Sequence, residues 1–264
     1  MIKRIKKTIL LLLLTGMPFW SMAWGLLGHR IVGEIADSYL TKKARRAIYG
    51  ILGTESIAMT SNWPDFIKSD PAYSYLSSWH YADIKGGMDS VSVRAYLDAD
   101  SSTDAYTKIN FLVAQLKNKD LEQEKKLMYL RLLIHIVGDI HQPLHVGRPD
   151  DQGGNKIKVL WFSDPFNLHQ IWDDKLIEFQ KLSYTEYVSA INHTTKEQRR
   201  EWQAEPMQEW FWQSYQLAEK VYGDFKQPDQ KLDYKYNFNY IGRLNQQLLK
   251  GGVHLAGLLN DIFG

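Results

Sequence analysis

The chain has 264 residues, and its 44% apolar content is enough for a substantial core, which excludes disorder as the default. Its formal charge of +2 includes four cations in the first 23 residues, a segment without acidic residues. Removing these four from the 32 Lys and Arg residues leaves 28 basic against 30 acidic side chains. This balance argues against a broad basic surface that grips duplex DNA, so any contact with nucleic acid is expected to be local.

The first 23 residues have the pattern of a secretory signal peptide. A basic stretch precedes an apolar run from Ile9 to Trp20, and residues 21–23 resemble a cleavage site with small side chains. The run is shorter than the roughly 20 residues of a membrane-spanning helix and contains Gly16 and Pro18, which argues against a membrane anchor. We expect an exported protein, periplasmic or secreted, whose mature domain comprises residues 24–264.

Helical spacing dominates the mature chain. It predicts two helices between Ile31 and Leu52, with Thr41 as a cap between them, and a loop over residues 53–71. Amphipathic patterns predict helices over 103–116 and 121–140, the second ending before Pro143. β-branched residues after Gly153 and Gly154 predict a short β-hairpin near 155–162. Helical periodicity returns over 167–179, 207–221 and 244–262, so we expect a single compact all-α domain.

Two of the predicted helices share one spacing, His135-x-x-x-Asp139 and His169-x-x-x-Asp173. At this spacing an imidazole and a carboxylate lie on one helical face. Zinc accepts both donors, and a catalytic zinc uses about three protein ligands. Because the chain has no cysteine, every ligand must be nitrogen or oxygen. Further donors are available upstream and between the two pairs: His29, Asp65, His80 and His145.

Taken singly, a pair of this kind is more often a surface hydrogen bond than a metal site. However, five of the eight histidines lie beside aspartates and among apolar residues that would bury them. Unpaired buried charges are costly, so a bound metal is the better explanation. The other three, His141, His193 and His254, are expected to have no ligand role, although His141 is a candidate for a hydrogen bond to a carboxylate or to the substrate.

In order and spacing, these residues resemble the motifs of the zinc-dependent S1/P1 nuclease family along essentially the whole mature chain. The motifs that carry the resemblance are Trp24-Gly25, Gly28-His29, Asn62-Trp63-Pro64-Asp65, Trp79-His80-Tyr81-Ala82-Asp83, His135-Ile136-Val137-Gly138-Asp139, Gln142-Pro143-Leu144-His145, Gly153-Gly154-Asn155 and Asn167-Leu168-His169 with Asp173. The resemblance implies the helical fold shared with zinc phospholipase C. Eukaryotic members use disulfides, so the absence of cysteine favours a bacterial member.

The resemblance also implies three zinc ions. It places Asp65, His80, His135 and Asp139 around the first ion, and His145, His169 and Asp173 around the second. The third ion would be held by the amine and carbonyl of Trp24, by His29 and by a bridging Asp139. Removal of the signal peptide would therefore complete the metal centre.

The activity implied is endonucleolytic hydrolysis of single-stranded DNA and RNA to 5'-phosphate products, together with 3'-nucleotidase activity. The attack on phosphorus would be in line, with zinc lowering the pKa of the water and Asp83 orienting it beside the metal-binding Asp65 and Asp139. Lys68 matches a phosphate contact, Tyr81 an aromatic that stacks a base, and Asn155 a contact to the base edge. Substrates would be single-stranded nucleic acid and 3'-nucleotides, and we expect a monomer without stable membrane association.

Three alternatives are weaker. A zinc phospholipase C would have a longer separation between the N-terminal Trp and the first His, and Glu in place of Asp173. A noncatalytic zinc-binding exported protein would not need Lys68, Tyr81, Asp83 and Asn155. A helical module that only binds partners leaves the histidine and aspartate spacing unexplained.

Overall fold

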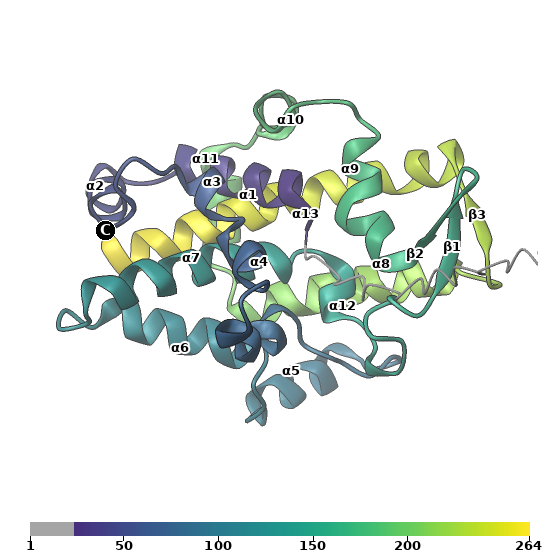
Figure 1. Ribbon diagram of the computed structural model, residues 1–264, viewed down its shortest axis with the longest axis horizontal. Helices are drawn as coiled ribbons and strands as arrows, with labels where there is room; N and C mark the ends of the chain where they lie inside the picture. The colour runs from purple at the N-terminus through teal and green to yellow at the C-terminus, as the bar shows by residue number, and fades with distance from the viewer. Residues whose placement is uncertain (1–23) are drawn as a thin grey trace, which may run out of the picture.

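Long helices packed side by side, with a small sheet at one end, make up the computed structural model, which describes residues 24–264 (Figure 1). The predicted signal peptide, residues 1–23, lies outside the described part. The elements run in the order α1 (Leu26–Ser38), α2 (Lys42–Leu52), α3 (Ile57–Thr60), α4 (Trp63–Ile67), η1 (Pro71–His80), α5 (Ser90–Asp98), α6 (Ala105–Lys117), α7 (Gln123–Asp139), η2 (Pro143–Val146), η3 (Pro149–Asp151), β1 (Lys158–Trp161), β2 (Asp164–Asn167), α8 (Leu168–Gln170), η4 (Ile171–Lys175), α9 (Leu176–Glu178), α10 (Tyr184–Ile191), α11 (Lys196–Gln203), α12 (Met207–Asp224), β3 (Gln230–Leu232) and α13 (Tyr234–Phe263). The predicted all-α class is confirmed.

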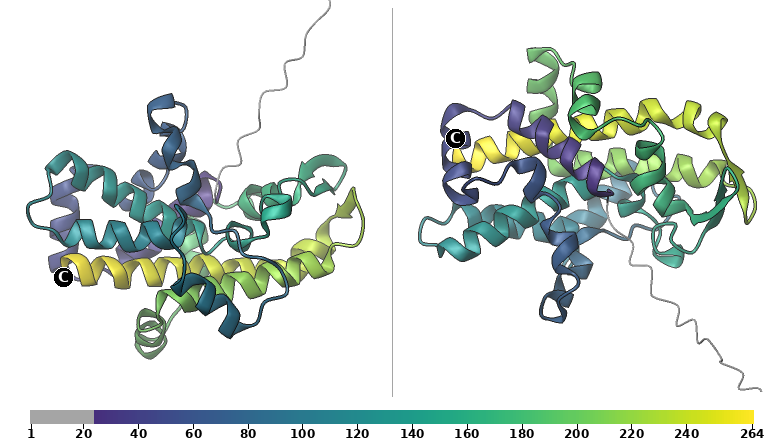
Figure 2. Two further views of the ribbon diagram at one scale, coloured as in Figure 1. Left: turned by 90° about the horizontal axis from the view of Figure 1, so that it is seen from below. Right: turned by 45° about the horizontal axis from the view of Figure 1, so that its top comes forward.

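The 30-residue helix α13 runs along the length of the molecule, as the views in Figures 1 and 2 agree. It packs against α1, α2, α7 and α11. At its contact with α1, a Cβ on Gly252 would overlap the Ile35 side chain and lie 3.1 Å from the carbonyl oxygen of Val32. Glycine at this position therefore lets the two helices approach closely. Within residues 24–264, no helix combines the length and the apolar character that crossing a membrane requires.

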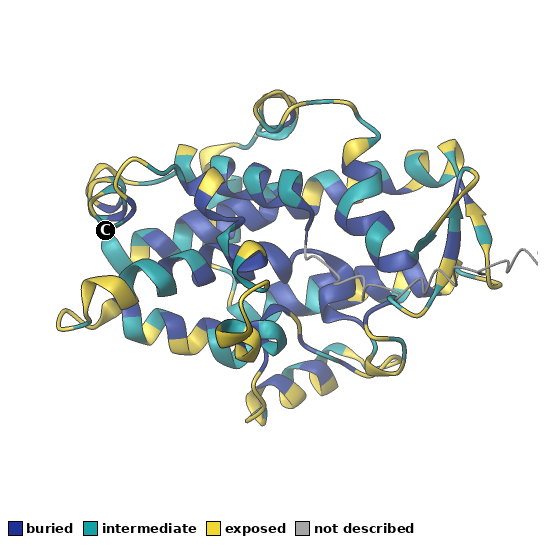
Figure 3. Cartoon of the chain, viewed as in Figure 1, coloured by how far each residue is buried: buried dark blue, intermediate teal, exposed yellow. Residues whose placement is uncertain are grey.

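The C-terminal half of α7 is buried on all of its faces. From Leu132 to Asp139 every residue of this helix is buried, and Figure 3 shows the interior-facing sides of the neighbouring helices buried as well. A helix without a solvated face has its polar side chains in the protein interior, where they need partners. Two such side chains, His135 and Asp139, are thereby placed at the centre of the molecule.

The predicted hairpin is present, with β1 and β2 antiparallel and Lys158 paired with Asn167. It continues to residue 167 rather than ending near 162. The parallel partner of β1, β3, was not expected because three residues are too few to show alternation. For the same reason residues 53–71, expected to be loop, contain the short helices α3 and α4.

The sequence predicted a helix from Leu244 onward, whereas α13 begins ten residues earlier, at Tyr234. Its first turns carry Tyr234 and Phe238, which are among the most exposed apolar side chains of the described chain. A stretch without a buried stripe shows no 3.6-residue apolar period, so periodicity alone could not extend the helix to Tyr234.

We predict opposite effects for two glycine substitutions in α13. Gly252→Ala should lower the free energy of unfolding by about 1–3 kcal/mol, because its methyl group overlaps Ile35. Gly242→Ala should raise it by about 0.5–1 kcal/mol, because that glycine is exposed in the same helix and nothing lies within 4 Å of the added Cβ. Thermal unfolding followed by circular dichroism measures both, and equal shifts would contradict the close α1–α13 contact.

Candidate metal centre

The eight candidate ligand side chains lie at the buried C-terminal end of α7. They come from α1 (His29), α4 (Asp65), η1 (His80), α7 (His135 and Asp139), η2 (His145), α8 (His169) and η4 (Asp173). None is more than 9% exposed. Side chains separated by more than 100 residues in sequence thus meet in one place, as the joint pattern predicted.

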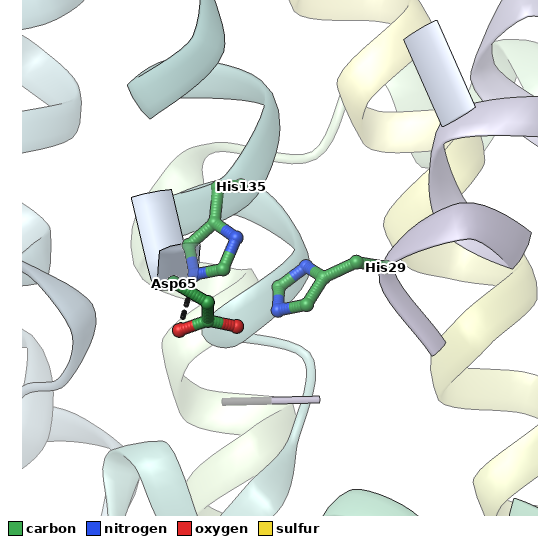
Figure 4. Close-up of side chains that lie close together, drawn as sticks. All are labelled: His29, Asp65 and His135. Carbon is green, nitrogen blue, oxygen red and sulfur yellow. Dashed lines mark ion pairs between the residues drawn. The ribbon is translucent and has the colours of Figure 1, made fainter. Parts of the chain in front are cut away.

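The first group of candidate ligands contains His29, Asp65, His80, His135 and Asp139. Within it, Asp139 contacts three histidines. Its Oδ1 lies 3.2 Å from Nε2 of His29, and its Oδ2 lies 2.9 Å from Nδ1 of His80 and 3.3 Å from Nε2 of His135. Asp65 approaches from α4, with Oδ1 3.7 Å from Nε2 of His135. Figure 4 shows His29, Asp65 and His135 converging from separate elements, and the two imidazoles stack with centroids 3.8 Å apart.

The second group contains His145, His169 and Asp173. The Nε2 atoms of the two histidines are 3.1 Å apart. Oδ2 of Asp173 lies 3.3 Å from Nε2 of His169, one turn earlier in the chain. The other oxygen of Asp173 accepts a 2.6 Å hydrogen bond from the Gln142 amide, which orients the carboxylate.

Backbone carbonyls fix the proton positions on three of these imidazoles. Nδ1 of His135 lies 2.6 Å from the carbonyl oxygen of Ser61. Nδ1 of His145 and Nδ1 of His169 lie equally close to the carbonyls of His80 and Gly153. A carbonyl oxygen can only accept, so each Nδ1 must carry the hydrogen. In the neutral rings the Nε2 atoms are then unprotonated and present lone pairs to the interior.

Without a cation this arrangement is unfavourable. Burial lowers the pKa of His145 well below its usual value and that of His169 to about 4, so both rings are neutral at physiological pH. Two lone pairs then face each other across 3.1 Å. Burial likewise raises the pKa of the Asp139 and Asp173 carboxyls well above their usual range.

Several buried ligand atoms also have no hydrogen-bond partner among the described residues. They are Nδ1 and Nε2 of His29, Nε2 of His80 and one carboxylate oxygen each of Asp65, Asp139 and Asp173. Buried polar atoms are normally paired, and a group of unpaired ones requires an explanation. Bound cations would satisfy those atoms that point into the two groups and would keep the carboxylates ionised.

The donor set fits zinc. Ligand atoms around a tetrahedral zinc are about 3.3 Å apart, given zinc–nitrogen bonds of about 2.0 Å. The closest contacts within the two groups, 2.9 to 3.3 Å, are of this size. Three sets of donors are mutually close enough to share an ion: His29 with Asp65 and His135, His80 with His135 and Asp139, and His145 with His169 and Asp173.

The last of these sets, His145 with His169 and Asp173, is the same set that the resemblance placed around the second ion. The first two sets share His135, and Asp139 also contacts His29, so they form one continuous cluster. Trp24 is fully buried near the first and the second group of candidate ligands. Its indole donates to the carbonyl of Gly138, and the following amide, that of Gly25, donates to the carbonyl of Asp173.

A cleft of about 610 Å³ opens onto the second group. His80, His145 and His169 form part of its wall. All four residues expected to handle substrate also line it: Lys68, Tyr81, Asp83 and Asn155. The expected substrate residues are therefore adjacent to the expected metal ligands His80, His145 and His169.

Contacts with neighbouring residues orient polar side chains of the cleft. The Lys68 ammonium lies 2.7 Å from Oδ1 of Asp65. Tyr81 is 40% exposed. Asn155 donates to the Gln152 carbonyl and accepts a 3.3 Å contact from Asn167. Burial, and secondarily the charge of Asp151, raises the pKa of the Asp83 carboxyl.

The expectation for His141 is wrong. Its Nδ1 donates to the carbonyl of Val137, and its Nε2 lies 2.7 Å from Nδ1 of His254, which belongs to α13. The ring therefore reaches neither a ligand carboxylate nor the cleft. Sequence reasoning also gave no role to Gln142 and Asn167, although both stand inside the quoted motifs.

Comparison with known proteins agrees with this geometry. The chain matches the S1/P1 nuclease family over residues 24–264. It is 30% identical to Endonuclease 3 of Arabidopsis thaliana, over 96% of this chain and 93% of that protein. It is 32% identical both to Nuclease P1 of Penicillium citrinum, over 62% of this chain and 63% of the relative, and to Nuclease S1 of Aspergillus oryzae, over 59% and 55%. The chain therefore belongs to the S1/P1 nuclease family of phosphodiester-hydrolysing enzymes.

Proposed function

We propose that the mature protein is a zinc-dependent endonuclease that hydrolyses phosphodiester bonds of single-stranded DNA and RNA to 5'-phosphate products, and that it also removes the phosphate of 3'-nucleotides. The observation that carries the proposal is the pair of unprotonated Nε2 atoms of His145 and His169, 3.1 Å apart in the wall of the cleft. This pair supports the binding of a cation in the cleft, where substrate would enter. Family membership supports the hydrolysis of nucleic acid.

We propose that three zinc ions are held there. Asp65, His80, His135 and Asp139 would bind one, and His145, His169 and Asp173 a second. The third would be held by the free amine and carbonyl of Trp24, by His29 and by Asp139. Zinc in such sites supplies Lewis-acid activation of water near neutral pH and neutralises phosphate charge.

The protein's own side chains would bind and orient the substrate. The Lys68 ammonium, at the cleft wall beside Asp65, would bind a phosphate oxygen. Asp83, also in the wall, would orient the attacking water and accept its proton, a role suited to a carboxyl whose pKa is raised by burial.

Two further residues favour an unpaired base. The exposed ring of Tyr81 offers a stacking surface, and Asn155, which keeps an N–H free after its bond to Gln152, would hydrogen-bond the base edge. Stacking tolerates every base but needs its face to be accessible, which a duplex prevents. The proposed preference for single strands follows from this requirement.

We also propose that residues 1–23 direct export and are removed, so that a monomeric protein beginning at Trp24 acts in the periplasm or outside the cell. An activity panel on the mature protein tests the assignment. Single-stranded DNA or RNA and a 3'-nucleotide should be hydrolysed. Hydrolysis of phosphatidylcholine alone would instead favour a phospholipase, and zinc binding without hydrolysis would favour a noncatalytic zinc-binding protein.

Replacing Asp139 should remove bound metal and activity together. Asp139→Asn should lose two of the three proposed zinc ions and nearly all hydrolysis of single-stranded DNA, because Asp139 contacts His29, His80 and His135. Zinc counting by elemental analysis measures the first effect. The matched control, Asp120→Asn at an exposed carboxylate, should change neither. Full zinc occupancy in Asp139→Asn would contradict the bridging role.

The N-terminal amine can be tested by extension. A protein that retains residues 21–23 should bind one zinc fewer than a protein beginning at Trp24, because Trp24 then has an amide in place of an amine. Native mass spectrometry gives the zinc count. An extension of equal length after Gly264, which is exposed, is the control. Equal zinc content and activity in both N-terminal forms would refute the role of the amine.

The stacking role of Tyr81 predicts a specific loss. Tyr81→Ala should weaken binding of a short single strand by about 1–3 kcal/mol, because one aromatic face is lost. Tyr81→Phe should bind normally, because it keeps the aromatic face. Fluorescence anisotropy measures both affinities. Unchanged binding in Tyr81→Ala would reduce the residue to a packing role.

A further inference from the structure

A row of aromatic side chains outside the cleft links α4, η1, α6 and α7. We call it the aromatic track, and its members are Trp63, Tyr73, Tyr75, Trp79, Phe111 and Tyr129. Successive ring centroids are 6.0, 6.5, 6.0, 6.2 and 5.6 Å apart. The rings therefore form a continuous chain of contacts rather than isolated packing pairs.

Only part of the track is needed for packing. Trp79 is buried and joins η1 to α6, which a structural role explains. Tyr75, in contrast, is 52% exposed, and Phe111 is 37% exposed. These two exposed rings both contact Trp79, and exposed apolar faces gathered in this way indicate a binding surface.

Cations accompany these faces. The Lys108 ammonium lies 4.9 Å from the centroid of Trp79 and 5.4 Å from that of Phe111. No carboxylate of the described residues lies within 4.0 Å of it. At the other end, the Arg131 guanidinium lies 5.3 Å from the centroid of Trp63 and is paired with Glu55. Aromatic faces with cations beside them are the combination that holds single-stranded nucleic acid.

The track is continuous with the metal centre through shared elements. α4 carries Trp63 and the ligand Asp65, and η1 carries Tyr75 and ends at His80. On α7, Arg131 lies one turn before His135 and therefore on the same face. From Tyr75 to His80 is about 10 Å along a 3₁₀ helix, the length of roughly three stacked nucleotides.

We infer that the aromatic track binds the part of a single-stranded substrate that extends beyond the cleft. The inference rests on the proposed function and deepens it. Bases stack on the exposed faces of Tyr75 and Phe111, and Lys108 contacts the backbone phosphates. A 3'-nucleotide is too short to reach Tyr75, so the track distinguishes long strands from small substrates.

The experiment compares two substrates in the zinc-loaded mature protein. For a 20-nucleotide single strand, Tyr75→Ala should lower kcat/KM by about fivefold or more, the smaller end of the effect of losing one stacked base. For adenosine 3'-monophosphate, kcat/KM should stay at the wild-type value. Tyr75→Phe should restore the long-strand value. Phe238→Ala, an 83% exposed aromatic on α13, is the matched control and should affect neither substrate.

A binding measurement separates this inference from the proposed function. The Kd of a labelled phosphorothioate 20-mer should rise by a similar factor in Tyr75→Ala. An unchanged Kd and an unchanged long-strand kcat/KM would contradict binding of the strand by the aromatic track. That result would favour a protein partner for its exposed faces. Equal losses on both substrates would also overturn the inference. Wild-type protein that binds the strand through Tyr75 but hydrolyses neither substrate would support the track and contradict the proposed function.

Discussion

The candidate metal centre depends on three hydrogen bonds from imidazole Nδ1 atoms to backbone carbonyls. Each bond fixes a tautomer and turns an unprotonated Nε2 toward the same interior region. None of the three rings is more than 4% exposed, so water has little access to these nitrogens, and those of His145 and His169 face each other in the wall of the cleft. The fold thus holds an arrangement that bound cations would stabilise, and metal binding at this site would then also stabilise the fold.

The packing of the helices also determines where the candidate ligands lie. α7 can carry two ligands into the centre only because its end is surrounded on every side. Gly138, between His135 and Asp139, leaves room for His29, whose Nδ1 would lie 2.9 Å from a Cβ at that position. Gly252 similarly brings α1, which carries His29, against α13. Small residues at two helix contacts therefore determine where one imidazole lies.

The sequence predicted the fold class, and it predicted that these donor side chains lie close together, because both are encoded in spacing. An i to i+4 pair such as His135 and Asp139 shares a face whatever the tertiary structure. The carbonyl partners of the histidines were not predictable, since a backbone oxygen is the same at every residue and only the fold selects Ser61 or Gly153. The partner of His141 was missed for a related reason, because His254 reaches it only through the packing of α13 against α7. Short elements such as β3 and α3 were missed because they contain too few residues for a period.

The backbone around Tyr81 is held from both sides. Nδ1 of His145 donates to the carbonyl of His80, and the amide of Ala82 donates to the carbonyl of His145. The residue between His80 and Ala82 is therefore fixed in the main chain, while its side chain projects into the cleft without a required contact. In evolution, or in an engineered variant, this side chain could therefore be exchanged to reshape the cleft without moving the candidate metal ligands.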